Sequence, residues 1–274
     1  MRSGVRNVAS TLSLTLLFTS AALGATWEAT VTASSPPSFP GPRPMHARYG
    51  LGWSGFPGAN ADVRLTKPSG NRFQLDGTVH TTGLVRTLWK FDGTHTSRVD
   101  AGTLHPLEMK QIENVRNKKT VTSLSFDSSG VTSRETKTPG AGPKIRRLDF
   151  PSLFDLYSAL LYLKSQPLQD RSIQRIVVYP ATSAYLATVT VLGRERLTGP
   201  SGTYNAIKLD LQLSKIGKDR ELEPHRKFRG ATVWLSDDAD RLLLRIQAQI
   251  FVGTVFAELQ SVEFDAAGPG SHLD

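Results

Sequence analysis

The chain has 274 residues, a formal net charge of +9 at pH 7 and no cysteine. The lack of cysteine excludes disulfides, thiol catalysis, cysteine-based metal sites and anchoring through a lipidated cysteine. The excess of basic residues favours anionic partners, but these residues are scattered and no aromatic–basic recognition motif accompanies them, so no nucleic-acid partner is expected.

The N-terminal 24 residues have the pattern of a signal peptide. Arg2 and Arg6 precede an uncharged apolar run over 11–23, and Ala22 and Gly24 supply the small residues of a cleavage site. A membrane anchor is the alternative, but a run of about 13 residues is shorter than the roughly 20 needed to span a bilayer. We therefore expect a soluble periplasmic product that does not span a membrane, with a charge of +7 once the two arginines are removed.

Three further segments are expected after the signal peptide. Residues 25–44 form a leader rich in Pro and Ser that cannot build a regular ladder. Residues 45–265 form one folded β-rich half-barrel domain, and residues 266–274 form a disordered tail. A domain of this size buries enough apolar surface to be stable without disulfides.

Apolar and polar residues alternate along many short stretches of this domain, which is typical of strands with one buried face. Turn signals rich in Gly, Pro, Asn, Asp and Ser separate these stretches. The clearest alternation runs over 47–53, 61–65, 73–79, 207–213, 231–235 and 242–250. The pattern predicts a mainly β fold of roughly ten to twelve strands, built as a single curved antiparallel sheet or an incomplete β-barrel.

Two segments break this alternation and predict helices. Ser152–Ser165 places leucines at helical spacing, and Ser152 with Asp155 three residues later matches a capping box. Apolar side chains cover nearly every face of this helix, so we expect it to be buried on the concave side of the sheet. A second, short helix is expected over Gly83–Phe91, where Leu84, Leu88 and Phe91 are in phase.

The stretch Val233–Ile250 contains four ionisable residues between two alternating apolar runs. These are Asp237, Asp238, Asp240 and Arg241, which could form a catalytic or metal-binding cluster. A short polar connection is also what a β-hairpin requires, and Asp is favoured in turns because its carboxylate accepts nearby backbone N–H bonds. The Gly and distal Glu of a calcium loop are absent at the required offsets, so a hairpin turn is the favoured interpretation.

Few other residues indicate chemistry. The six histidines are dispersed and none has a second metal ligand at zinc-motif spacing, so neither a metal nor another cofactor is expected. A general acid at Glu195, or at Asp237 and Asp238, could serve glycoside hydrolysis if a second carboxylate lay nearby. Most charges of this kind are surface residues, and no catalytic residue is assigned.

Four stretches of the sequence carry a family resemblance. They are YGLGWSG at 49–55, DLYSALLYLK at 155–164, WLSDD at 234–238 with Arg241, and GTVFAEL at 253–259. Together they resemble the exported bacterial family called domain of unknown function 3108, with Lys164 at a position where the family is expected to have Arg. The resemblance implies a periplasmic, β-rich protein of unassigned activity with the open half-barrel shape of outer-membrane lipoprotein carriers, and it transfers no catalytic residue.

The buried helix and the concave sheet define the candidate site. Any space that the helix leaves unfilled would be an apolar pocket suited to an acyl chain, lined by Trp53, Tyr157, Leu160 and Tyr162; the alternative is that the helix fills the concavity as core. The leading function is a non-enzymatic binding or envelope-assembly protein whose ligand would be a lipid, lipopolysaccharide or glycan. The alternatives are a hydrolase of envelope glycans and a structural partner of an envelope complex.

Overall fold

The computed structural model describes residues 26–32, 41–140 and 142–265, and the chain divides into two compact units. The first unit, which ends at Thr30, contains a short 3-10 helix, η1 (Trp27–Thr30). The second unit begins at Val31 and contains every other helix and strand of the described residues. All of the features discussed below belong to this second unit.

Three of the predicted segments lie wholly or partly outside the described residues. These are the signal peptide over 1–24, the leader at 33–40 and the tail over 266–274. The last part of the leader, residues 41–44, is described and is held against the domain. There, Arg43 pairs with Asp240 at 2.5 Å, and its guanidinium lies 4.0 Å from the centre of the Phe264 ring.

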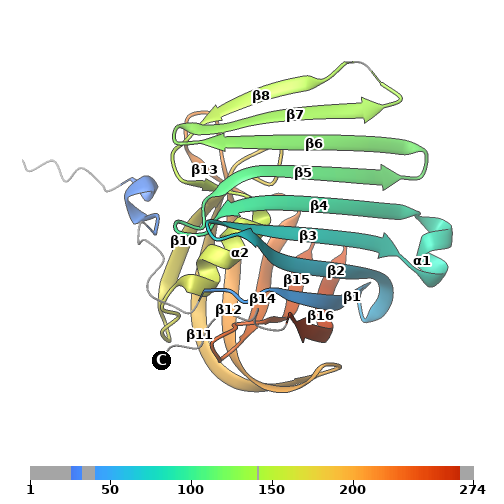
Figure 1. Ribbon diagram of the computed structural model, residues 1–274, viewed down its shortest axis with the longest axis vertical. Helices are drawn as coiled ribbons and strands as arrows, with labels where there is room; N and C mark the ends of the chain where they lie inside the picture. The colour runs from blue at the N-terminus through green and yellow to red at the C-terminus, as the bar shows by residue number, and fades with distance from the viewer. Residues whose placement is uncertain (1–25, 33–40, 141, 266–274) are drawn as a thin grey trace, which may run out of the picture. The chain divides into compact units, whose positions relative to one another are not determined.

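The strands form one large sheet that does not close into a barrel (Figure 1). They are β1 (Met45–Trp53), β2 (Phe56–Ser69), β3 (Arg72–Thr81), β4 (Phe91–Asp100), β5 (Pro106–Val115), β6 (Lys118–Asp127), β7 (Gly130–Thr138), β8 (Lys144–Asp149), β9 (Leu153–Phe154), β10 (Ile173–Val178), β11 (Tyr185–Gly199), β12 (Gly202–Ile216), β13 (Leu222–Pro224), β14 (Phe228–Ser236), β15 (Leu243–Ile250) and β16 (Gly253–Phe264). Their order is β8-β7-β6-β5-β4-β3-β2-β1-β16-β15-β14-β12-β11-β10-β9, with β13 paired to β12.

The pairing is antiparallel throughout the described sheet except between the short β9 and its neighbour β10. The predicted mainly β fold with a single sheet is therefore confirmed. The sheet has 16 strands, more than expected. The additional strands are mainly β5 to β8. In these strands Thr, Ser, Lys and Glu occupy many positions, so the apolar alternation is weak.

The principal helix is α2 (Leu156–Ser165), which begins four residues later than predicted. Ser152 has a positive φ of 59°, and Leu153–Phe154 pairs with β10 as β9. The predicted capping box of Ser152 and Asp155 is therefore wrong. Asp155 is itself the N-cap: its carboxylate accepts the backbone N–H of Tyr157 and Ser158, and the Ser158 hydroxyl accepts the Asp155 backbone N–H in return.

The predicted second helix is present as α1 (Gly83–Leu88) and is shorter than expected. Phe91 is not part of it but the first residue of β4, and its backbone N–H donates to the Thr81 hydroxyl at the end of β3. Leu84 and Leu88, the apolar residues that indicated the helix, are 75% and 67% exposed. Helical spacing thus predicted the helix correctly, but the apolar side chains that carry the spacing are exposed and not buried.

The core lies where α2 meets two parts of the sheet. In Figure 1 the antiparallel strands β3 to β8 lie roughly horizontal, and the C-terminal strands are drawn at a steep angle to them; α2 contacts both β4 and β10. Fully buried side chains come from both parts and from the segment after the helix: Leu65, Val99, Met109, Leu124, Val131, Leu168, Val177, Ile207, Leu209, Leu235 and Leu259. The helix is therefore positioned by the sheet from two sides.

The acidic stretch between β14 and β15 is a hairpin connection, as predicted. The Asp238 carboxylate accepts the backbone N–H of Asp240 and Arg241 at 3.0 Å and the hydroxyl of Ser236 at 2.7 Å. The Asp237 backbone N–H donates to the carbonyl of Asn205 in β12. The Asp238 carboxylate thus acts as the acceptor of the turn, which is the physical reason that Asp is favoured there.

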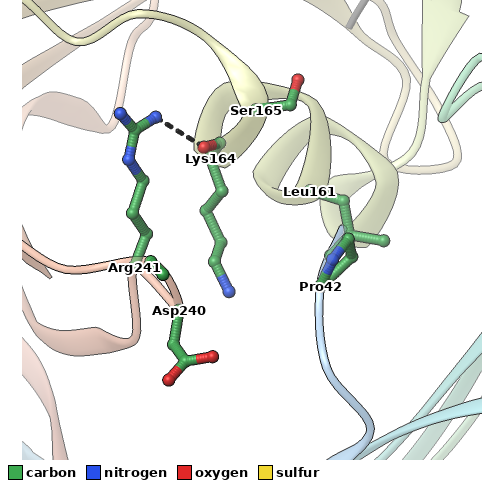
Figure 2. A pocket seen from close by; sticks show the side chains of 7 residues that line it. Pro42, Leu161, Lys164, Ser165, Asp240 and Arg241 are labelled. Atoms are coloured by element: carbon green, nitrogen blue, oxygen red, sulfur yellow. Dashed lines mark hydrogen bonds between the residues drawn. The ribbon is translucent and has the colours of Figure 1, made fainter. Parts of the chain in front are cut away.

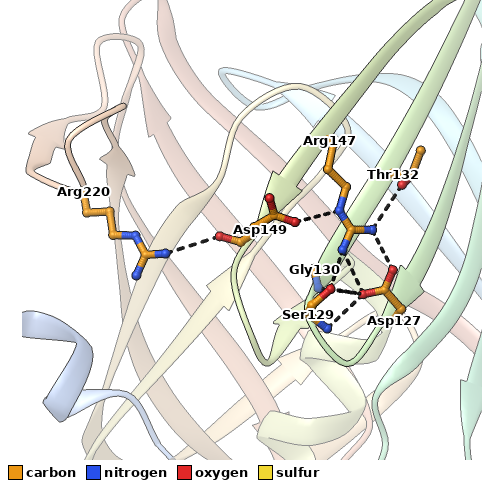
Figure 3. Close-up of polar contacts among 7 residues, drawn as sticks. All are labelled: Asp127, Ser129, Gly130, Thr132, Arg147, Asp149 and Arg220. Atoms are coloured by element: carbon orange, nitrogen blue, oxygen red, sulfur yellow. Dashed lines mark hydrogen bonds and ion pairs between the residues drawn. The ribbon is translucent and has the colours of Figure 1, made fainter.

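The β6–β7 turn uses the same chemistry (Figure 3). The Asp127 carboxylate accepts the backbone N–H of Ser129 and Gly130. Arg147 of β8 donates to Asp127 at 2.6 Å and to Asp149 at 2.8 Å, and its guanidinium is the main reason that the pKa of Asp127 lies well below its usual range. These contacts attach the edge strand β8 to the neighbouring hairpin.

Candidate ligand cavity

A cavity of about 500 Å³ lies between α2 and the strands β10, β11, β12, β14 and β15. It is lined by Leu156, Tyr157, Ala159, Leu160, Leu163, Ile176, Val178, Pro180, Tyr185, Ala187, Val189, Leu211, Leu213, His225, Val233, Leu243 and Ile246. Most of these side chains are aliphatic, so they offer dispersion contacts but almost no hydrogen bonds. The helix thus leaves part of the concavity unfilled, and the space suits an apolar ligand.

One face of α2 forms the roof of this cavity. Leu156, Leu160 and Leu163 follow each other at helical spacing and share a face. Leu156 is 55% exposed and Leu160 is half-buried, whereas Leu161 on another face is only 4% exposed. The apolar side chains of the roof are therefore incompletely covered by the protein itself.

Tyr157, one of the lining residues in the first turn of α2, also packs closely against β3 and β4. The Tyr157 ring meets the His95 ring edge-on with centroids 4.4 Å apart. A Cβ atom on Gly77 would lie 1.9 Å from the Tyr157 hydroxyl oxygen, so this close approach requires glycine at position 77. Burial raises the pKa of Tyr157 to about 12 and lowers that of His95, so both side chains are neutral at pH 7.

The first turn of α2 is fixed to the same part of the sheet by a buried hydrogen bond. The Ser97 hydroxyl of β4 donates to the Asp155 carboxylate at 2.5 Å, and both residues are fully buried. The other carboxylate oxygen caps the helix through Tyr157 and Ser158. The carboxylate is satisfied by these three donors, which offset the cost of burying its charge.

The last turn of α2 is fixed by Arg241, a role that the sequence did not reveal (Figure 2). The Arg241 guanidinium is buried and donates to the backbone carbonyls of Lys164, at 2.6 Å, and Gln166. These carbonyls belong to the helix C-terminus, which a cation stabilises. Burial lowers the pKa of Lys164 to about 8, although Asp240 and Asp238 oppose this shift. No local sequence signal links Arg241 to a helix 75 residues earlier.

His225 supplies a polar group to the cavity lining. Its Nδ1 accepts the backbone N–H of Lys227 at 3.2 Å and of Phe228 at 2.9 Å. In the neutral ring the proton therefore sits on Nε2, which remains a donor. The ring also lies 5.2 Å from that of Tyr185, another lining residue. The cavity thus combines an aliphatic interior with one histidine donor.

The structure brings together only part of the predicted site. Of the four residues named, Tyr157 and Leu160 line the cavity. Trp53 lies elsewhere: it ends β1, is 52% exposed, and its indole N–H donates to the carbonyl of Val252. Tyr162 is buried on another face of α2, where its ring packs on Phe154. Apolar character alone could not distinguish the faces of an all-apolar helix.

The carboxylates considered for glycan hydrolysis do not converge on this cavity. Glu195 accepts the indole N–H of Trp234 at 2.7 Å and pairs with Lys208, and these contacts lower its pKa. Asp237 lies 3.4 Å from Arg194. A general acid of a glycosidase needs a raised pKa, which is opposite to the environment of Glu195. Glu195 and Asp237 therefore make structural contacts, and neither lines the cavity.

A family model covers the helix and most of the sheet just described. The model named Protein of unknown function (DUF3108) matches residues 47–260. The chain belongs to this family. The match confirms the family resemblance that the sequence carries in β1, α2, the β14–β15 hairpin and β16. No curated protein matches the chain.

The fold of this DUF3108 protein also occurs among solved structures. A beta-barrel-like protein of domain of unknown function DUF1849 from Brucella abortus is 9% identical, with a TM-score of 0.58, over 82% of this chain and 99% of that chain. A protein from Bacteroides fragilis NCTC 9343, whose name describes export and a YmcC-like fold, is 7% identical, with a TM-score of 0.36, over 82% and 98%. Among the described residues of the DUF3108 protein, no helix has the length and apolar character needed to cross a bilayer.

Proposed function

We propose that this DUF3108 protein is a non-enzymatic binding protein that holds the apolar chain of an amphiphile, such as a lipid or lipopolysaccharide, beneath α2. The observation that carries the proposal is the aliphatic cavity of about 500 Å³. This volume falls within the roughly 300 to 1,000 Å³ of small-molecule sites. An acyl chain suits the lining better than a glycan, because sugar hydroxyls would lose hydrogen bonds to water without replacement.

The polar end of the ligand would lie at His225. Its Nε2 proton can be donated to an anionic or hydroxyl oxygen, since Nδ1 is already occupied by two backbone N–H groups. Arg226 and Lys227 follow in the same loop, and both side chains are exposed. An anionic head group is therefore favoured over a cationic one.

The binding would take place outside the cytoplasm, in the periplasm. Support comes from the basic, apolar and small-residue regions that occur in the required order in the first 24 residues. The absence of cysteine is compatible with export, because the fold does not depend on disulfides.

A fluorescent fatty acid tests the proposal. The purified protein should bind the probe at micromolar concentration, and mass spectrometry should detect a lipid that co-purifies from its native envelope. Ala159→Phe would place a larger side chain in the cavity and should weaken probe binding at least about tenfold, while Leu192→Phe on the exposed face of β11 should not. Absence of both probe binding and a co-purifying lipid would overturn the proposal.

A further inference from the structure

Six large apolar side chains are exposed at one end of the sheet. We call them the tip patch: Trp53, Phe56, Leu84, Leu88, Trp89 and Phe251, with exposed fractions from 49% to 75%. They come from three separate elements, namely the β1–β2 turn, α1 with the residue after it, and the β15–β16 turn. An apolar surface of this kind is costly in water and marks an interaction site when it is contiguous.

The strand register and local contacts bring these three elements together. Trp53 pairs with Phe56 across the β1–β2 turn, and its indole N–H donates to the carbonyl of Val252 at 3.1 Å in the β15–β16 turn. The start of α1 is joined to β2, because the Thr82 backbone N–H donates to the carbonyl of Gly58 at 2.9 Å. Figure 1 shows α1 and the β1–β2 turn at the same end of the sheet. The tip patch is thus one surface.

Basic side chains accompany the apolar ones. Lys90 follows Trp89, and the β5–β6 turn adds Arg116 and Lys118; Arg116 donates to the carbonyl of Leu88 at 3.2 Å, which places this turn beside α1. The Lys227 ammonium lies 5.7 Å from the Phe251 ring centre. In the part of the chain that the structure describes, none of these four cations lies within 4 Å of a carboxylate. Their charge is available to an anionic partner.

The tip patch is connected to the ligand cavity by a short chain of contacts. His225 lines the cavity, and its Nδ1 accepts the backbone N–H of Lys227. The Lys227 carbonyl accepts the backbone N–H of Phe251 at 3.0 Å, and the Lys227 ammonium lies over the Phe251 ring. Lys227 therefore contacts both His225 of the cavity lining and Phe251 of the tip patch.

We infer that the tip patch docks on an anionic lipid bilayer and brings the His225 side of the cavity to the lipid surface. Tryptophan and phenylalanine on loop tips, with lysine and arginine beside them, match the two-part chemistry of an anionic membrane interface, which takes up apolar side chains and attracts cations. The role given to the His225 side of the cavity rests on the proposed function, whereas docking on the bilayer does not.

A protein partner fits the tip patch less well. Protein interfaces are most often depleted of lysine at their centre, whereas Lys90 and Lys227 adjoin the exposed aromatic side chains of Trp89 and Phe251. A lipid surface tolerates this mixture, because the cations reach head groups while the rings enter the interface. The cations and the exposed apolar side chains together therefore favour an anionic bilayer as the partner.

Sedimentation with vesicles tests the docking. The protein should sediment with vesicles of phosphatidylethanolamine and phosphatidylglycerol, and binding to vesicles of phosphatidylcholine alone should be at least about tenfold weaker. Leu88→Ser should weaken binding to the anionic vesicles, whereas Leu192→Ser, which removes the same exposed side chain from β11, should not. The double variant Lys90→Glu with Lys118→Glu, which reverses two exposed cations beside the tip patch, should also weaken binding to the anionic vesicles at low salt, and added salt should reduce the difference from the unmodified protein.

The fluorescent fatty acid separates this inference from the proposed function. Leu88→Ser should bind the probe in solution as tightly as the unmodified protein, because Leu88 does not line the cavity. Failure of vesicle binding with intact probe binding overturns the docking alone. Equal loss with Leu88→Ser and Leu192→Ser would also overturn it, as would a defined protein partner that binds the tip patch while anionic vesicles do not.

Discussion

The two parts of the sheet that face α2 contact the helix in different ways. On the side of β3 and β4, Tyr157 meets His95 with ring centroids 4.4 Å apart, and Ser97 donates to Asp155 at 2.5 Å. On the side of β10 to β15, aliphatic side chains face the same helix across a cavity of about 500 Å³. The helix thus packs closely against β3 and β4, partly through polar contacts, whereas an apolar cavity lies between it and the strands β10 to β15.

This difference explains how a buried helix can coexist with a cavity. Protein interiors are close-packed, so a void beside a helix persists only when other contacts hold the helix in place. Asp155 fixes the first turn through the sheet, and Arg241 fixes the last turn through the carbonyls of Lys164 and Gln166. Helix ends held by specific hydrogen bonds leave the middle of one face free to contact a ligand.

Truncation of leucines on the two sides should give the largest contrast. Leu161→Ala removes a side chain that is 4% exposed and packed in the core, so it should cost about 2 to 5 kcal/mol in the free energy of unfolding. Leu160→Ala removes a half-buried side chain at the cavity, so it should cost less than about 2 kcal/mol and mainly weaken binding of a fluorescent fatty acid. Urea unfolding measures the stability of each variant, and titration measures its binding of the probe. Equal losses of stability in the two variants would contradict the description of one closely packed and one open side of α2.

Removal of the buried cap should have the next largest effect. Asp155→Ala loses the N-cap of α2 and the acceptor of the Ser97 hydroxyl, which together should cost about 2 to 4 kcal/mol. The control is Asp100→Ala. Asp100 also accepts two backbone N–H groups, from Gly102 and Thr103, but in an exposed turn, so its loss should cost about 1 kcal/mol. Similar thermal unfolding of the two variants would show that burial of Asp155 is unimportant.

The fit between Gly77 and Tyr157 gives a third test. Gly77→Ala should cost about 1 to 3 kcal/mol because the new methyl group meets the Tyr157 hydroxyl oxygen. Gly70→Ala should change stability by less than about 0.5 kcal/mol, since a Cβ there has open space. Adding Tyr157→Phe to Gly77→Ala should restore part of the loss, and a double-mutant cycle measures that coupling. Strictly additive effects would mean that the two residues do not compete for the same space.

The sequence predicted the sheet better than the site. Period-two alternation marked strands such as β1, β3 and β12, because each buries one face whatever its neighbours are. The helix was predicted from its apolar character, but its start was not. Pairing of Leu153–Phe154 with β10 takes these residues out of the helix, and such pairing depends on contacts distant in the sequence.

The site depended on information that no local pattern contains. The volume left beside α2 is set by side chains from five strands, among them Ile176, Leu211 and Ile246, and a sequence does not show how much space they fill. Trp53 sits at the end of β1, where the alternation no longer fixes which way a side chain points. His225 was one of six dispersed histidines, and only the fold places it at the cavity.

Acidification should lower the free energy of unfolding, because His95 is buried against Tyr157 of α2 in its neutral form. Burial holds the pKa of His95 below its ordinary value of 6.5, against the opposing influence of Asp155 and Gln111. The unfolded chain therefore binds a proton at a higher pH than the native protein does. Stability should be fully present above about pH 6.5 and should decrease as the pH falls toward the native pKa, by at most about 1.4 kcal/mol per pH unit for one histidine.

His105 must be separated from His95 in this test, because burial also lowers its pKa while its ring stacks on Phe154. Lys164 adds no slope in this range: its pKa of about 8 is below its ordinary 10.5, so its contribution changes between pH 10.5 and 8 and is constant below. Urea unfolding at pH 7 and 5.5 should show a smaller stability loss for His95→Gln than for the unmodified protein, and His105→Gln should remove a separate share. If His95→Gln leaves the pH dependence unchanged, the ring is not buried as neutral imidazole against Tyr157, and the close contact on that side of α2 does not depend on its protonation.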